Sequence, residues 1–388
     1  MAKKCFVLTD VASDVHVAEA SYGPADVTGA AKSWSVQVKT LAGGLRDGVQ
    51  VVDVTTGALR VVFVPTRGMA IWKLWWNGVA VGWQAPVQGP VHPRFVPLTD
   101  ASGLGWLDGF DELLCRCGLQ SNGAPEWDER GRLLWTLHGR IGNLPAHALS
   151  VTIDGDSGEV SLRGEVDEVR LFGQKLRLVS TATVRPDLPR VAIRDEIVNR
   201  SAEPGELALL YHVNFGAPVV VPGTRLVVPA KTVSPRDDRA AARAHEWDRC
   251  GPGEPLRKEE VFYLELHADE GSRTRALLAA PGDSCGASVA WDVRQLPCFT
   301  LWKNPQSAAD GCVTGLEPGT NHPNRRSFEK LRKRIVALAP GATHAVDLEL
   351  EFHPDAAAVA RAQADVARIA AGRAAELRTQ IDPRWAPL

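Results

Sequence analysis

Short apolar runs separated by turn signals constrain the fold of this chain more than any other feature. The run at residues 69–76 is followed by Asn77-Gly78, a dipeptide typical of tight β-hairpins. Residues 191–198 and 345–352 alternate apolar and polar side chains, as in a sheet with one solvated face. The chain shows neither alternating strand and helix patterns nor an internal repeat of about 20 to 50 residues. The sequence therefore predicts a mainly β protein, with large antiparallel sheets packed as a sandwich.

The same patterns divide the chain into three parts. We expect an N-terminal extension at residues 1–50 that packs on the sandwich, a β-sandwich domain at 51–353 and a helical tail at 354–388. The tail contains an alanine-rich helix from about residue 355 to 380, whose apolar stripe predicts docking on a sheet or, alternatively, a homodimer contact. The charged stretch at 234–258 is interpreted as an exposed insertion. The expected strands are 59–64, 69–76, 79–83, 148–153, 159–166, 175–185, 190–199, 207–214, 226–228, 261–267, 275–280, 288–291, 299–302, 330–338 and 344–352.

Composition excludes several classes of protein. The 388 residues include 44 Lys and Arg against 46 Asp and Glu, so a sustained basic surface for nucleic acid is absent. The N-terminus lacks the apolar core of a secretory signal, and no stretch approaches the ~20 apolar residues that span a bilayer. Seven cysteines, an odd number, fit reduced thiols, and Cys115-x-Cys117 lacks the spacing of common zinc sites. We expect a cytoplasmic protein that binds neither nucleic acid nor membrane.

Three polar residues stand out against apolar surroundings. Glu317 lies between Leu316 and Pro318, where an expected strand meets a glycine-rich loop, and His138 and His212 belong to two earlier segments. Burial raises the pKa of a carboxyl towards the working pH, as a general base requires, and histidine can donate a proton near neutral pH. Each residue alone is as well explained by a hydrogen bond or salt bridge inside a sheet. Together they indicate acid–base chemistry.

The segments around these residues resemble motifs of the aldose 1-epimerase (galactose mutarotase-like) superfamily, in particular its bacterial mutarotase-like branch. The order of two histidines followed by a glutamate agrees with that family, and the resemblance covers roughly residues 51–352. The matching segments are Leu137-His138-Gly139, Tyr211-His212-Val213-Asn214-Phe215, Leu301-Trp302-Lys303-Asn304-Pro305 and Leu316-Glu317-Pro318 followed by Thr320.

This resemblance implies a galactose mutarotase-like sandwich and a cofactor-independent sugar mutarotase, with a small sugar as its partner and no metal. Glu317 would be the general base, His212 the general acid, and His138 a ligand of sugar hydroxyls. The family's arginine before the first histidine has two equal candidates, Arg116 and Arg67. Further candidates for substrate contact are Asp111 (favoured over Asp269 for the family's aspartate), Arg140, Asn214 and Trp302.

Three other functions stay open from the sequence. The same acid–base pair could move a proton beside the carbonyl of an open-chain sugar, as an aldose–ketose isomerase or C2 epimerase does. A carbohydrate-binding protein on the same fold is a second alternative, although such a protein has no need of a matched acid and base. A metal-dependent lyase or isomerase using His138, His147, His212 and His322 is the third.

Overall fold

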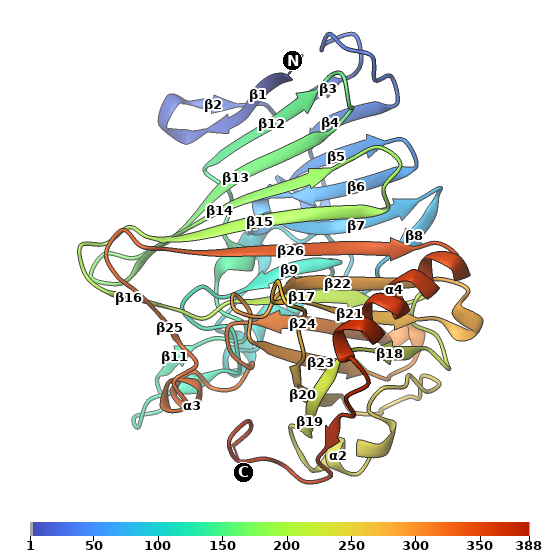
Figure 1. Ribbon diagram of the computed structural model, residues 1–388. Coiled ribbons are helices and arrows are strands. Elements are labelled where there is room, and N and C mark those ends of the chain that lie inside the picture. Colours follow the sequence, from blue (N-terminus) through green and yellow to red (C-terminus); the bar gives the residue numbers. More distant parts are fainter. Residues whose placement is uncertain (1–2, 388) are drawn as a thin grey trace.

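Two large β-sheets stack face to face and form most of the molecule (Figure 1). The computed structural model describes residues 3–387. The predicted mainly β sandwich is confirmed, and the first sheet has ten antiparallel strands. In spatial order they are β18 (Arg225–Val227), β21 (Arg273–Ala279), β22 (Gly286–Asp292), β26 (Thr343–His353), β15 (Arg190–Asn199), β14 (Lys175–Val184), β13 (Val160–Val169), β12 (Ala148–Asp154), β1 (Lys3–Asp10) and β2 (Val15–His16).

The second sheet has thirteen strands, and its middle strands carry the candidate site. Its strands are antiparallel apart from the short pair β19–β27. In spatial order they are β27 (Glu376–Leu377), β19 (Ala230–Pro235), β20 (Glu260–Leu266), β23 (Cys298–Asn304), β24 (Val313–Gly319), β17 (Leu210–Phe215), β9 (Leu114–Cys117), β7 (Ala70–Trp76), β6 (Leu59–Val64), β5 (Gln50–Thr56), β4 (Trp34–Thr40) and β3 (Glu19–Tyr22), with β8 (Val79–Val81) also paired to β7.

The remaining elements are short, except for one helix near the C-terminus. Two small sheets pair β10 (Glu126–Trp127) with β11 (Leu133–Trp135), and β16 (Gly205–Leu207) with β25 (Val336–Leu338). The α-helices of the described chain are α1 (Asp100–Gly103), α2 (Asp238–Ala241), α3 (Arg326–Leu331) and α4 (Ala356–Ala370). None of these helices is long and apolar enough to cross a membrane.

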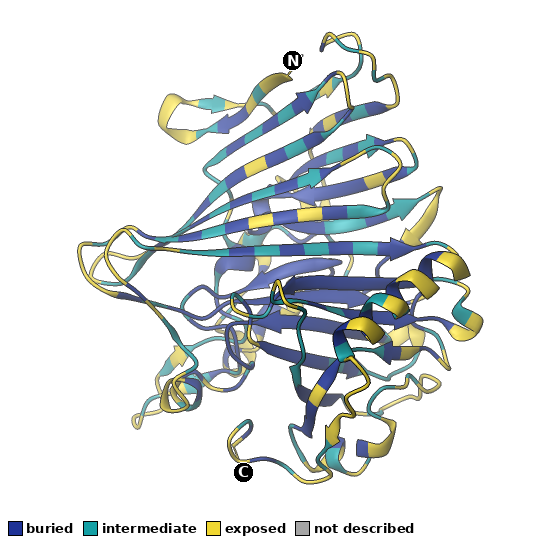
Figure 2. Ribbon diagram, viewed as in Figure 1, coloured by how far each residue is buried: buried dark blue, intermediate teal, exposed yellow. Residues whose placement is uncertain are grey.

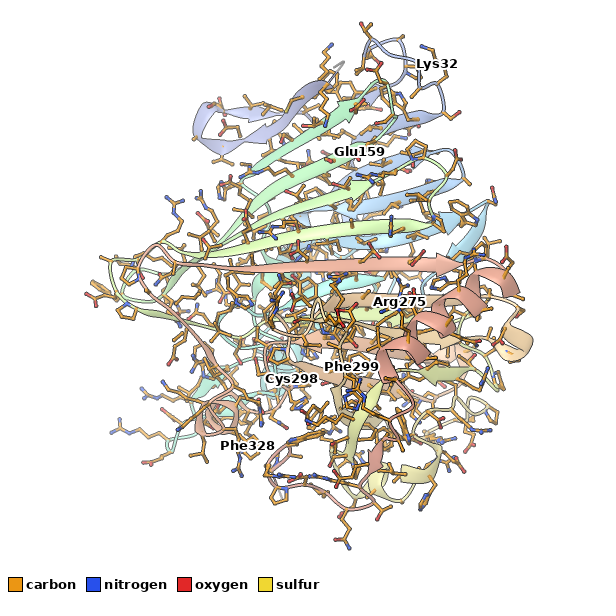
Figure 3. The ribbon with its side chains drawn as sticks, in the orientation of Figure 1. Lys32, Glu159, Arg275, Cys298, Phe299 and Phe328 are labelled. Carbon is orange, nitrogen blue, oxygen red and sulfur yellow. The ribbon has the colours of Figure 1, made fainter. Side chains whose placement is uncertain are left out.

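Alternating side chains on the facing strands build the core between the two sheets. Along β14 and β15, buried residues alternate with partly exposed ones, as Figure 2 shows. Phe299 of β23, labelled in Figure 3, stacks across the gap on Trp291 of β22, with ring centroids 5.3 Å apart. Such burial of apolar surface contributes roughly 25 cal/mol per Å² and is the main force that holds the sheets together.

Residues 3–50 contribute strands to both large sheets. β1 pairs with β12 at the edge of the ten-stranded sheet, and β3 and β4 extend the thirteen-stranded sheet beyond β5. Gln50, the last residue of the expected extension, is already the first residue of β5. The segment expected to pack on the sandwich therefore supplies strands of the sandwich itself.

The C-terminal helix is shorter than expected and lies on the ten-stranded sheet. Asp355 caps its start by accepting a hydrogen bond from the Ala358 amide at 2.8 Å. α4 ends at Ala370, because Ala371 adopts a left-handed backbone with φ +50°, instead of continuing to about residue 380. Its Val359 packs on Leu277 of β21, so the apolar stripe docks on a sheet face.

Two expected strands differ from those observed. Residues 330–338 begin inside α3, where the buried side chains Arg326 and Glu329 are three positions apart, as on one face of a helix. Only β25 remains of the expected strand. The expected strand at 207–214 is divided between β16 and β17.

Candidate active site

Glu317 and His212 face each other on neighbouring strands of the thirteen-stranded sheet. On β24, Leu316 packs in the core between the sheets, so Glu317, the next residue, points to the outer face. On β17, Val213 lies opposite Leu316, which brings His212 beside Glu317. Nε2 of His212 is 3.2 Å from Oε1 of Glu317. An acid–base pair thus forms from two strands that are far apart in the sequence.

Hydrogen bonds determine which nitrogen of His212 carries the proton. Nδ2 of Asn214 donates to the Glu112 carbonyl oxygen at 3.0 Å and to the His212 carbonyl oxygen at 3.3 Å. Oδ1 of Asn214 must therefore be the acceptor for Nδ1 of His212, which lies 2.6 Å away. In the neutral ring Nδ1 holds the proton, and the lone pair of Nε2 faces Glu317.

Burial gives the two partners opposite protonation preferences. Glu317 is 2% exposed and His212 is 3% exposed. Loss of hydration raises the pKa of Glu317 well above its usual value, and it lowers the pKa of His212 to about 3. Both groups favour their neutral forms, so the pair shares a single proton. Oε1 of Glu317 makes no hydrogen bond within the described chain, which leaves it available to a bound molecule.

His138 reaches the same place from a loop. Its backbone φ is +55° and that of Gly139 is +69°, where a Cβ would lie 2.1 Å from a backbone oxygen. Its Nδ1 donates to the Asn122 carbonyl oxygen at 2.9 Å, and its ring centroid is 5.5 Å from that of His212. Burial acts to lower the pKa of His138, but the negative charge of the Cys117 thiolate and the hydrogen bonds to Cys117 and the Asn122 carbonyl outweigh it and raise the pKa to about 9. His138 is therefore a cation at neutral pH.

Aromatic rings surround His212. The ring centroids of Trp106, Phe110 and Trp302 lie 6.1, 5.0 and 5.2 Å from that of His212. Trp302 was expected at the site from the sequence, whereas Trp106 and Phe110 were not singled out among many aromatic residues. Their apolar faces suit the C–H groups of a sugar ring.

Two charged residues that the sequence analysis missed also belong to this site. Oε2 of Glu259 accepts from Nε1 of Trp302 at 2.7 Å, and Oε1 accepts from Nη2 of Arg236 at 2.8 Å. Both charges act on the pKa of Glu317. Burial acts to raise the pKa of Glu259, but Arg236 outweighs it and lowers the pKa. Arg236 lies within the insertion at 234–258 and Glu259 directly follows it, and charged residues are so frequent there that no sequence signal distinguishes these two.

A row of polar side chains continues from Glu317 across the sheet. Thr300 of β23 lies opposite Glu317, and Tyr263 of β20 lies opposite Thr300. The Thr300 hydroxyl and Nδ1 of His322 are buried without a hydrogen bond in the part of the chain described. The His322 ring stacks on Tyr263 with centroids 4.2 Å apart. The unpaired groups are further candidate ligand contacts, and only the strand register reveals them.

Gly315 leaves space for the side chains of Glu317 and His212, and replacing it by Ala is expected to lower activity strongly. A Cβ there would lie 2.6 Å from Oε1 of Glu317 and 3.3 Å from Cε1 of His212. Displacing catalytic groups by about 1 Å can lower a rate ~10²-fold. Gly23→Ala is the matched control, because its Cβ would meet nothing within 4 Å. The rate of the reaction catalysed at this site should fall in Gly315→Ala alone, and equal rates in both variants would contradict this arrangement.

The two arginines predicted to bind sugar have other roles. Arg116 of β9 points into the core between the sheets, where it pairs with Asp195 at 2.5 Å and also contacts Ser180. Since residues alternate along a strand, it lies on the opposite face from His212, and the prediction for Arg116 is wrong. Arg67 is 1% exposed and pairs with Glu112, and it donates to Asn143 at 2.7 Å and to the Gly109 carbonyl at 3.0 Å. Arg67 therefore stabilises the loop that carries Phe110.

The other residues predicted to contact the sugar interact with other groups of the protein in this structure. Asn214 uses its amide to orient His212 and so has a positioning role. Oδ2 of Asp111 accepts from Trp72 at 2.7 Å, and burial raises the pKa of Asp111 to about 7. The charge of Arg140 acts on the buried Glu168. Asp269 accepts backbone hydrogen bonds in the turn between β20 and β21.

The four histidines considered for a metal do not converge. His147 lies beside the ten-stranded sheet, with Nε2 3.4 Å from Oδ2 of Asp167 on β13. His322 stacks on Tyr263. Within residues 3–387, no three His, Cys, Asp or Glu side chains are grouped so that they could hold a metal ion.

Comparison with known proteins places the chain in a family. A family model described as "Domain of unknown function (DUF4432)" matches residues 46–352. The chain belongs to the DUF4432 family. The match includes His138, His212 and Glu317 and covers nearly all of the domain expected at 51–353.

Solved structures connect this DUF4432 chain with the mutarotase-like fold. A Klebsiella pneumoniae protein described provisionally as an aldose 1-epimerase is 30% identical, with a TM-score of 0.95 over 98% of this chain and 99% of its own. A galactose mutarotase-like protein from Clostridium acetobutylicum (12% identity, TM-score 0.55, 83% and 99% covered) shares the fold. So does a galactose mutarotase related enzyme from Lactobacillus acidophilus (12%, 0.54, 78% and 97%). The resemblance predicted from the motifs is confirmed, while no curated protein matches.

Proposed function

We propose that this DUF4432 protein is a cofactor-independent sugar mutarotase. The observation that carries the proposal is the contact between His212 and Glu317, two buried groups 3.2 Å apart, for which burial raises the pKa of Glu317 and lowers that of His212. Interconversion of anomers needs one group to remove a proton from the C1 hydroxyl and another to protonate the ring oxygen. The aromatic wall and the unpaired polar groups around the pair suit a small polyhydroxylated ring.

The reaction begins with proton transfers at the two oxygens of the hemiacetal carbon. Transfer of the shared proton to His212 gives a carboxylate at Glu317 and an imidazolium beside it. Glu317 then takes the proton of the C1 hydroxyl while His212 protonates the ring oxygen, the C1–ring oxygen bond breaks, and the open-chain carbonyl forms. Rotation about the C1–C2 bond and closure with both transfers reversed give the other anomer. No proton leaves C2 in this sequence.

His138 and Asn214 assist this chemistry in different ways. His138 is a cation at neutral pH, and the bond from its Nδ1 to Asn122 fixes the orientation of its ring. A fixed positive charge of this kind stabilises negative charge that develops on a sugar oxygen. Asn214 holds the His212 ring with Nε2 towards Glu317.

The proposed role of His138 predicts a fall in activity at high pH. Its pKa is raised from 6.5 to about 9, so the cation is present below that value and is lost as the pH rises through it. We expect kcat/KM to fall above about pH 9, measured by polarimetry with the spontaneous rate subtracted at each pH. The variant His138→Gln should have a lower rate without this fall. A wild-type rate that stays constant to about pH 10 would contradict the assignment.

The function itself is tested with freshly dissolved single anomers. Glucose, galactose, xylose and arabinose are each followed by polarimetry, with and without the protein. We expect the protein to accelerate the approach to anomeric equilibrium for at least one sugar, with no change in sugar identity at the end. If a ketose or a C2 epimer forms instead, the same residues act as an isomerase or epimerase. Saturable binding with no acceleration would indicate a carbohydrate-binding protein.

A further inference from the structure

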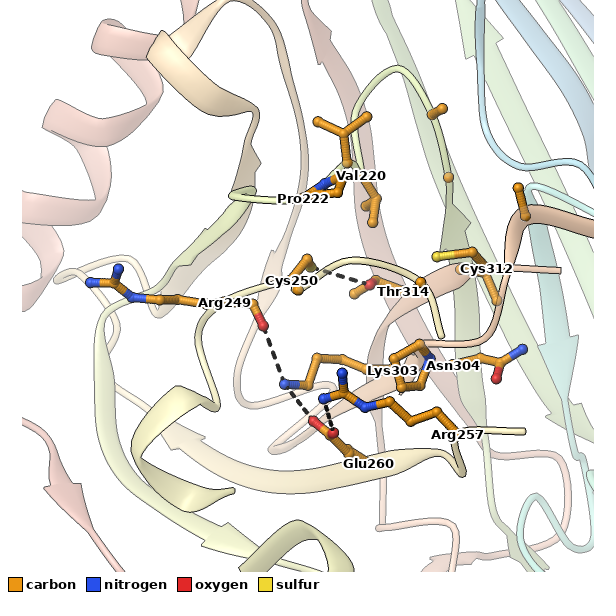
Figure 4. A pocket seen from close by; sticks show the side chains of 18 of the residues that line it. Val220, Pro222, Arg249, Cys250, Arg257, Glu260, Lys303, Asn304, Cys312 and Thr314 are labelled. Atoms are coloured by element: carbon orange, nitrogen blue, oxygen red, sulfur yellow. Dashed lines mark hydrogen bonds and ion pairs between the residues drawn. The ribbon is translucent and has the colours of Figure 1, made fainter. Parts of the chain in front are cut away.

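A large cavity lies near the candidate site, where β23 ends and β24 begins. It has a volume of about 630 Å³, within the range of roughly 300–1,000 Å³ that is usual for small-molecule sites. Trp302 and Glu259 belong to the candidate active site, whereas their neighbours Lys303 and Glu260 line the cavity. Figure 4 shows Lys303 and Glu260 among the residues that line the cavity. The insertion at 234–258 therefore borders both the candidate site and the cavity.

Three cations surround a single buried carboxylate in the wall of this cavity. Oε2 of Glu260 is 2.9 Å from Nζ of Lys303, and its Oε1 is 2.7 Å from Nη2 of Arg257. Nε of Arg243 lies 3.2 Å from the same Oε1. The side chains of Glu260, Lys303 and Arg257 are 4%, 7% and 14% exposed, so these three groups are largely removed from water, whereas Arg243 is 41% exposed.

Two of the three carboxylates that pair with these cations are exposed to solvent. The other carboxylates that pair with the two arginines are Glu246 and Glu254, and both are more than half exposed. Solvent and salt weaken such exposed pairs, whereas a buried charge keeps its full need for a partner. Nε of Arg243 is buried without a hydrogen bond in the described chain. An anion in the cavity would be a further partner for these cations.

The rest of the lining is largely apolar. Val220, Pro222, Val313 and Cys312 contribute carbon and sulfur surface, and Asn304 and Thr314 add neutral polar groups (Figure 4). A site with cations at one side and apolar groups elsewhere suits a molecule with one charged end and an apolar body. A free inorganic ion would leave most of the 630 Å³ unfilled.

We propose that this cavity is a second ligand site, which binds a small organic anion with an apolar body. The anionic group, a carboxylate or a phosphate ester, pairs with Arg257 and Arg243 beside Lys303. The body of the ligand packs against Val220 and Pro222. This inference stands independently of the mutarotase proposal, because neither His212 nor Glu317 lines the cavity.

The test uses three probes that share one aromatic body and differ in charge. Benzoate, phenyl phosphate and benzyl alcohol are titrated into the full-length protein, and binding is followed by calorimetry and by ligand-observed NMR. We expect at least one anion to bind about tenfold tighter than benzyl alcohol, and the better anion identifies the acidic group. If neither anion binds, or if benzyl alcohol binds equally well, the proposal is wrong.

Variants of lining residues test whether the anion binds in this cavity. Arg257→Gln and Arg243→Gln should each weaken binding of the anion about tenfold, whereas the matched control Arg239→Gln should leave it unchanged. Arg239 lies in the same insertion, is 52% exposed and does not line the cavity. Ala308→Trp adds a large side chain at an exposed lining position and removes no charge, so it should weaken binding strongly even if the arginine variants are unstable. Unchanged binding in Ala308→Trp would overturn the assignment.

Discussion

Glu317→Gln is expected to lower the rate of anomer exchange by at least ~10²–10⁴-fold while the protein stays folded. Glutamine has nearly the shape of a protonated glutamate, but it neither accepts nor releases a proton at these pH values. Removing the Glu317 carboxyl group also stops the proton transfer from Glu317 to His212, since Nε2 of His212 faces Oε1 of Glu317 at 3.2 Å. Polarimetric rates of the purified variant, relative to wild type at equal concentration, measure the effect.

Stability distinguishes this catalytic role from a structural one. Burial raises the pKa of Glu317, so its charged form is unfavourable in the folded protein. Replacing the carboxyl by a neutral amide should therefore leave the melting temperature unchanged or raise it slightly. Loss of activity together with a clearly lower melting temperature would indicate that Glu317 supports the fold. Full activity in the variant would remove Glu317 from the mechanism.

Asp195→Asn is expected to destabilise the fold by about 3–5 kcal/mol. Asp195 of β15 accepts from Arg116 of β9 and from the Tyr211 hydroxyl of β17 at 2.7 Å, so it joins the two sheets inside the core. Arg116 and Asp195 are 1% and 0% exposed. Removing the carboxylate leaves the guanidinium buried without its counter-charge, and urea unfolding should detect the loss as a lower midpoint.

The neighbouring residue on the same strand provides the control. Glu196 points to the other face of β15, is 44% exposed and pairs with Arg194 at 3.6 Å. Glu196→Gln should change the free energy of unfolding by less than about 1 kcal/mol, because exposed ion pairs contribute little. Similar losses in the two variants would show that the buried ion pair does not anchor the sheets.

The strand pattern was predictable where one face of a strand is buried and the other is wet. The alternation in β15 and β26 set their bounds within one residue of the observed ones. The pairing of β1 with β12, and of β17 with β24, joins segments so distant that no local pattern reports it. Local periodicity therefore identified the class of fold, while the order of strands needed the structure.

The sequence motifs predicted which three residues form the centre of the site, but they did not predict the contacts around them. The order of His138, His212 and Glu317 along the chain is a sequence property, and the structure brings the three together. Arg116 was misplaced because all four residues of β9 are buried, so hydrophobicity gives no sign of which face each occupies. Arg236 and Glu259 escaped notice because their position depends on how a charged insertion folds back on Trp302.

Proton NMR of a sugar in heavy water with the wild-type protein tests the central claim most directly. Exchange between the two anomeric C1 signals and the intensity of the C2 signal are followed in one sample. The account predicts faster exchange between anomers and full retention of the C2 proton, because the His212–Glu317 pair moves protons only on oxygen. Deuterium entering C2, or an anomer exchange rate equal to that of the sugar alone for every sugar tested, would contradict it.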